Sequence, residues 1–74
     1  MAVAIEHSGS NIDFDIGEIM GINEARISGN IPSEDVEALG ILAWNKVNKC
    51  IHLDLQQFCS GWVFGYHAVI AGIA

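Results

Sequence analysis

The chain has 74 residues, of which 51% are apolar and 16% are charged, so it is too apolar for a disordered protein and has the length of one domain, residues 1–74. Nine acidic residues against three Lys or Arg give a net charge of −6. Because direct nucleic-acid binding needs clustered cations, this balance argues against it and favours a partner protein with a basic surface.

The charges are unevenly placed along the chain. The first 37 residues hold eight of the nine acids, with only Arg26 to oppose them, whereas the second half has Asp54 against Lys46 and Lys49. A domain this small buries only about 60% of the surface that its unfolded chain exposes. We therefore expect an acidic contact surface, and additional burial against a partner or a second copy.

The two cysteines, Cys50 and Cys59, are fewer than a small secreted scaffold usually carries. Met1 opens no basic, signal-like segment. The strongly apolar stretch 62–74 has 13 residues, short of the roughly 20 that a spanning helix needs. These features predict a cytoplasmic protein with free thiols and no membrane contact.

In the first half of the chain, apolar and polar residues alternate over 3–6 and again over 12–16, where Asp13 and Asp15 would share the solvent face of a strand. The pattern predicts a hairpin of these two strands, and residues 25–31 read as a third strand. Eleven isoleucines against four leucines also favour strands, because β-branched side chains fit a pleated surface.

A helix is predicted over 33–49. Ser33 suits the N-cap, the acids Glu34, Asp35 and Glu37 suit the positive end of the helix dipole, and lysines lie in the last turn. The apolar stripe at helical spacing contains Val36, Leu39, Leu42 or Ala43, and Val47.

The remaining chain predicts a strand over 50–56 and a turn over 58–61. Residues 62–74 fit either a strand with Trp62, Phe64 and Tyr66 on one face or a helix with Ser60 as its N-cap. The expected fold is thus a small α+β or α/β domain. It would have three to four mostly antiparallel strands, the helix 33–49, and a second C-terminal helix if 62–74 is helical.

About half of the chain resembles a STAS domain, the fold of anti-sigma-factor antagonists. The resemblance lies in Ile27–Ile31, in Val36–Leu39, in the LDL run Leu53–Leu55, and in the turn at Ser60 and Gly61. It implies regulation of sigma-factor signalling, with Ser60 at the position of the family's phosphorylated serine. The chain departs from the family because its LDL strand and Ser-Gly turn are too close together.

The residue types that form metal, catalytic or phosphate-binding sites do not occur here at the spacings typical of such sites. Cys50, His52, Cys59 and His67 are the ligand types that zinc prefers, but their spacing matches no standard site. A thiol triad of Cys59, His52 and Asp54 would need a cleft that so short a chain hardly provides. The glycines of Gly17-x-x-x-Gly21 lack the Lys and Ser or Thr of a phosphate loop. We expect no cofactor and no metal.

The sequence therefore predicts a non-enzymatic protein that docks on a larger, basic protein and regulates or inhibits it. Anti-CRISPR proteins and other phage inhibitors of bacterial defence are similar in size and charge. The alternatives are a STAS-like regulator and a small zinc- or thiol-dependent enzyme. The predicted partner-binding residues are Asp13, Asp15, Glu34, Asp35, Glu37 and Trp44, and Trp62, Phe64 and Tyr66 are expected to mediate self-association into a homo-oligomer.

Overall fold

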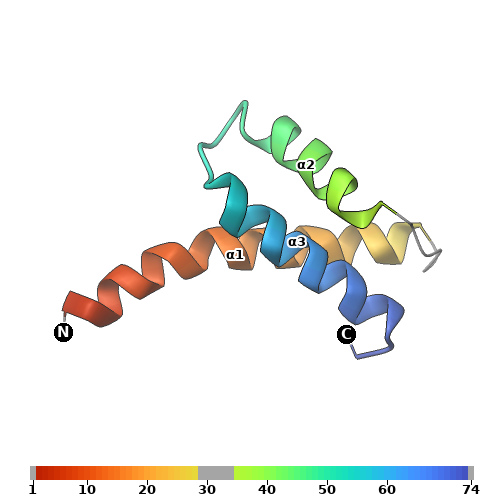
Figure 1. Cartoon of the computed structure of the whole chain (residues 1–74), viewed down its shortest axis with the longest axis horizontal. Helices are drawn as coiled ribbons and strands as arrows, with labels where there is room; N and C mark the ends of the chain where they lie inside the picture. The colour runs from red at the N-terminus through yellow and green to blue at the C-terminus, as the bar shows by residue number, and fades with distance from the viewer. Residues whose placement is uncertain (1, 29–34, 74) are drawn as a thin grey trace.

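A computed structural model describes residues 2–28 and 35–73, with side chains from Ile12 onward. Within these residues the protein consists of three helices, α1 (Ala2–Ile27), α2 (Val36–Val47) and α3 (Leu55–Ile70), as Figure 1 shows. The described residues contain no strand. The predicted α+β or α/β fold is therefore wrong, and the domain is all-α.

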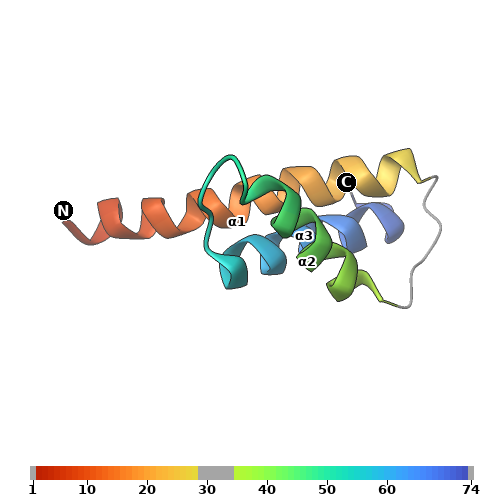
Figure 2. The same cartoon turned by 90° about the horizontal axis from the view of Figure 1, so that it is seen from above.

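The three helices are arranged around α3. Helix α1 runs alongside α3 in the same direction, and α2 crosses back over α3 in the opposite direction (Figures 1 and 2). Both α1 and α2 pack against α3, but among the described residues they hardly touch each other. The bundle is consequently open between α1 and α2.

Four glycines bring the backbones of α1 and α3 into contact. On α1, a Cβ added at Gly17 or Gly21 would overlap the carbonyl of Phe58 or Trp62. On α3, a Cβ at Gly61 or Gly65 would overlap the carbonyl of Phe14 or Glu18. Glycines four residues apart lie on one helix face, and small residues there allow two helices to approach closely. We call this contact the glycine interface.

The side-chain core draws on all three helices and on the segment before α3. Trp62 and Tyr66 are both 2% exposed and stack with their ring centroids 5.2 Å apart. Helix α2 covers the indole at Gly40, where an added Cβ would lie 3.3 Å from Cε3 of Trp62. The other buried hydrophobic residues are Ala25, Val36, Leu53, Phe58 and Val69.

Local hydrogen bonds fix the two ends of α3. Asp54 is the N-cap, and its carboxylate accepts a hydrogen bond from the backbone N–H of Gln57 at 2.9 Å. At the other end, Gly72 adopts a positive φ of 80°. The N–H of Gly72 bonds to Val69 and that of Ile73 to Ala68, which is the Schellman pattern.

The strand predictions are wrong because the exposed isoleucines produce the alternation of apolar and polar residues that is typical of a strand. Residues 3–6 and 12–16 belong to α1, as does the predicted third strand as far as Ile27. Its remainder lies partly outside the described residues. Residues 50–56 form the connection after α2 and the first turn of α3. In α1 the glycines face the neighbouring helix and isoleucines such as Ile12 and Ile19 face outward, so the usual amphipathic pattern is absent.

The helix predictions agree more closely with the structure than the strand predictions do. The helix predicted over 33–49 is α2, although it begins at Val36, and Ser33 and Glu34 lie outside the described residues. The helical alternative for the C-terminal segment is correct, but α3 begins earlier, at Leu55. Ser60 is therefore inside the helix and not its N-cap, and the predicted turn over 58–61 is helical.

Candidate functional site

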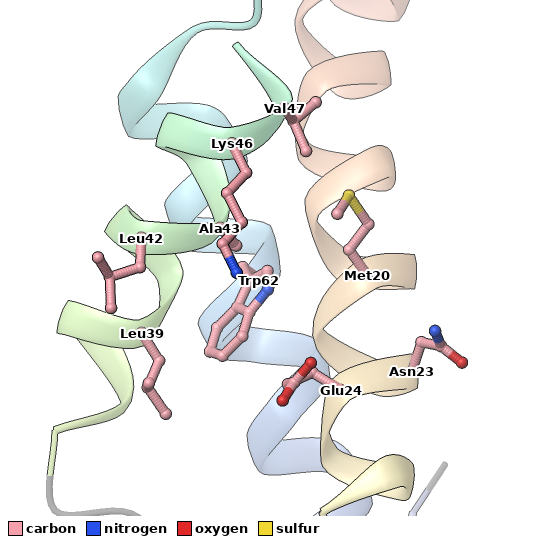
Figure 3. Close-up of a pocket in the computed structure, with 9 residues that line it drawn as sticks. All are labelled: Met20, Asn23, Glu24, Leu39, Leu42, Ala43, Lys46, Val47 and Trp62. Atoms are coloured by element: carbon pink, nitrogen blue, oxygen red, sulfur yellow. The ribbon is translucent and has the colours of Figure 1, made fainter. Parts of the chain in front are cut away.

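The opening between α1 and α2 forms an apolar groove, shown in Figure 3. Its cavity measures about 270 Å³, and its apolar lining comes from all three helices. We call it the α1–α2 groove. Its apolar residues are Met20 on α1, Leu39, Leu42, Ala43 and Val47 on α2, and the indole of Trp62 on α3.

Polar groups of both signs edge this groove. Asn23 and Glu24 line it from α1, and Lys46 extends over Trp62 from α2 (Figure 3). Outside this lining, near the start of α3, Asp13 on α1 accepts a hydrogen bond from the backbone N–H of Asp54 at 2.9 Å. An apolar groove with charged edges can hold the apolar face of an amphipathic segment.

A second groove lies between α2 and α3. Its cavity measures about 580 Å³. Ile41, Val63 and Phe64 give it an apolar lining, and Glu37, Cys59, Ser60 and His67 complete it. Phe64 is 57% exposed, and its ring lies 5.9 Å from that of Phe14 on α1. We call this the α2–α3 groove.

The predicted acidic contact residues that the structure describes lie on α1 and at the start of α2. In a helix, residues two positions apart point about 200° away from each other, so Asp13 and Asp15 do not share a face. Asp13 is half-buried beside Asp54, whereas Asp15 is exposed. Asp35 and Glu37 are exposed at the start of α2, and Glu37 lines the α2–α3 groove. Glu34 lies outside the described residues.

Trp44, predicted to contact a partner, has a structural contact within the chain. It is half-buried, and its indole N–H donates a hydrogen bond to the carbonyl of Leu53 at 2.8 Å. This bond joins α2 to the segment that leads into α3.

The three aromatic residues predicted to mediate self-association have different environments. Trp62 and Tyr66 are buried in the core of the chain itself, whereas Phe64 is exposed beside the α2–α3 groove. Of the three, Phe64 alone is exposed.

The cysteines and histidines are not gathered into a site. Cys50 and His52 are exposed in the connection after α2, and Cys59 and His67 line the α2–α3 groove. The described residues contain no group of three or more His, Cys, Asp or Glu placed to hold a metal ion. Both cysteines are free, and burial raises the pKa of the Cys59 thiol, which disfavours its thiolate.

Comparisons of the chain with protein-family models, with curated proteins and with solved structures gave no match. Of the positions behind the STAS resemblance, Leu53–Leu55 lead into α3 and Ser60 and Gly61 lie within it. Within the described ranges, no helix combines the length and the apolar character that a membrane crossing requires.

Sequence reasoning missed both the glycine interface and the groove beside it. Gly17 and Gly21 lack the other residues of a phosphate loop, and Gly61 and Gly65 fall in the predicted turn 58–61 and in the ambiguous segment 62–74. The signal was the same four-residue spacing in two segments, because that spacing places small residues on one face of each helix.

Proposed function

We propose that this protein is a non-enzymatic binding module whose α1–α2 groove holds an amphipathic helix from a larger protein with a basic surface. The observation that carries the proposal is the open groove: among the described residues, α1 and α2 both pack on α3 but hardly touch each other, and an apolar lining lies between them. A fourth helix lying there would cover Leu42, which is 56% exposed, and complete the bundle.

The charge of the chain supports a basic partner. The chain carries a net charge of −6, and the exposed acids of α1 include Asp15 and Glu24. Such a field accelerates encounter with a positively charged surface and slows encounter with an acidic one. Proteins that bind nucleic acid carry basic surfaces of this kind, and occupation of such a surface would inhibit them.

The proposal can be tested with two synthetic helical peptides of the same length. One carries leucines on one face and lysines on the other, and its counterpart carries glutamates in place of the lysines. Titration calorimetry with the full chain should detect binding of the lysine peptide, weakened by salt because the Debye length falls from about 10 Å at 0.1 M to about 3 Å at 1 M. Equal binding of both peptides would contradict the proposal.

Two neighbouring residues provide a matched pair of variants. Leu42 lines the α1–α2 groove and Ile41 lines the α2–α3 groove, and the two are similarly exposed, at 56% and 47%. Leu42→Ala should weaken binding of the lysine peptide by about tenfold, the size of a modest interface contact, and Ile41→Ala should leave it unchanged. The opposite ranking would move the site to the other groove.

A second pair of variants separates the groove from the general acidic field. Glu24→Gln and Asp15→Asn each remove one exposed negative charge from α1, but only Glu24 lines the groove. Glu24→Gln should weaken binding more than Asp15→Asn does, because the Glu24 carboxylate would lie beside the bound peptide. Equal losses would show that charge alone, and not the groove, attracts the peptide.

A further inference from the structure

We infer that two copies of this chain associate through the outer face of α3, defined by Ser60, Val63, Phe64 and His67. These residues follow one another at spacings of three, one and three, which places them on one side of the helix. Ser60, Phe64 and His67 are exposed, and Val63 is half-buried. All four line the α2–α3 groove.

The distribution of charge selects a second copy as the occupant. Two molecules of net charge −6 repel each other unless they meet at a surface with few charges. Helix α3, from Leu55 to Ile70, contains no Asp, Glu, Lys or Arg, whereas α1 carries five acids against Arg26. The outer face of α3 is therefore where two acidic copies can approach with least repulsion.

This face offers both an exposed ring and a cavity that can receive one. The exposed ring of Phe64 stands at the edge of the 580 Å³ cavity that Ile41 and Val63 line. In a two-fold dimer each patch meets its own copy, so each Phe64 ring can enter the cavity of the other molecule. Aromatic side chains that fill a pocket on the partner are the usual anchors of such interfaces.

The polar groups favour an antiparallel pairing. If the two-fold axis passes between Val63 and Phe64, Ser60 faces His67 of the second copy at both ends of the contact, and a hydroxyl and an imidazole can form a hydrogen bond. In a parallel pairing the two His67 side chains would instead lie next to each other, and neither would face Ser60. Among the described residues, Glu37 is the acid that lines the groove. Helix α2 runs opposite to α3 (Figure 1) and Gly40 packs on Trp62. Glu37, about one turn before Gly40, is therefore displaced toward the C-terminal end of α3, away from the axis.

Sedimentation velocity of the intact chain tests this inference. At micromolar concentration the chain should sediment as a dimer. Phe64→Glu should raise the dimer dissociation constant by at least about 100-fold, since it places a carboxylate in an apolar contact. Leu42→Glu is the control and should leave the dimer dissociation constant unchanged. Leu42 is 56% exposed, close to the 57% of Phe64, but it lines the α1–α2 groove.

Disulfide trapping tests the register. In a Cys50→Ser, Cys59→Ser background, the double variant Ser60→Cys, His67→Cys should oxidise to a covalent dimer. Either single variant should not, because seven residues of helix place identical positions about 10 Å apart. A monomeric wild-type chain, a Phe64→Glu chain that remains dimeric, or efficient crosslinking of the single variants would each overturn the inference. None of these results depends on the α1–α2 groove, so the two proposals can fail separately.

Discussion

The two interfaces of α3 are built on opposite principles. Against α1, the contact depends on the absence of side chains at Gly17, Gly21, Gly61 and Gly65. Against α2, it depends on the largest side chain available, because the indole of Trp62 fills the space below Gly40. Close backbone approach allows weak Cα–H···O contacts and dense van der Waals packing, whereas burial of Trp62 gives a large hydrophobic contribution.

This difference predicts how each interface responds to mutation. The glycine interface has no flexible atoms to move aside, since the groups that face each glycine include backbone carbonyls. The Trp62 interface is formed by side chains, which can adjust their rotamers. Added atoms should therefore be costly in the first interface, and removed atoms should be costly in the second.

The largest expected effect is that of Trp62→Ala. The substitution removes a side chain that is 2% exposed, stacks on Tyr66 and forms part of the α1–α2 groove. A buried Trp→Ala change costs about 3–5 kcal/mol, which is most of the stability of a domain of this size. Urea denaturation followed by circular dichroism at 222 nm should show a chain that is largely unfolded without denaturant.

Trp44→Ala is the control for this variant, since Trp44 is half-buried. It should cost less than Trp62→Ala, although it also removes the hydrogen bond to Leu53. If the two variants are equally destabilised, the core is not centred on Trp62.

Gly61→Ala should have the next largest effect. The new Cβ would overlap the backbone carbonyl of Phe14, so α1 and α3 must separate. Overpacking of this kind costs about 1–3 kcal/mol or more and exceeds the gain of up to about 1 kcal/mol in helix propensity. We expect a net loss of about 2 kcal/mol in the free energy of unfolding, measured by urea denaturation. An unchanged or more stable variant would mean that the helices are not in backbone contact here.

The sequence predicted the parts of the fold in which side chains follow ordinary helical rules. The stripe of Val36, Leu39 and Val47 with lysines at its end identified α2, and the helical alternative for 62–74 identified much of α3. Helix α1 could not be found in this way. An amphipathic helix normally turns its large apolar residues inward. In α1 this pattern is reversed, because Ile12 and Ile19 are exposed and the glycines face inward.

The candidate site was harder to predict for a related reason. A groove between helices can be predicted only when the pairing of the helices is known. The predicted strands also placed the acids on the wrong surfaces. Charge counting still identified an acidic first half, which does not depend on fold. It could not show that Asp13 lies against the start of α3 while Asp15 faces solvent.

A smaller effect is expected at the start of α3, beside the glycine interface. Asp54→Ala removes the carboxylate that caps Gln57 and should lower the free energy of unfolding by about 1 kcal/mol. Asp54→Asn is the matched control, since asparagine also caps helices well, and it should lose less. Thermal or urea denaturation of the two variants checks this. Equal losses would indicate that the charge of Asp54, and not its capping bond, stabilises the helix.

Gly40→Ala should have the smallest effect and gives the sharpest comparison between the interfaces. Its new Cβ would lie 3.3 Å from Cε3 of Trp62, a tight contact with a side chain and not with a backbone. A small shift of the indole relieves this contact, and alanine favours the helix by about 1 kcal/mol over glycine. The free energy of unfolding should therefore stay the same or rise by up to about 1 kcal/mol, seen as a higher urea midpoint with an unchanged m-value. The same glycine-to-alanine change would then have opposite signs on the two sides of α3. If Gly40→Ala is as destabilising as Gly61→Ala, the indole is held as rigidly as a backbone, and the contrast between the two interfaces fails.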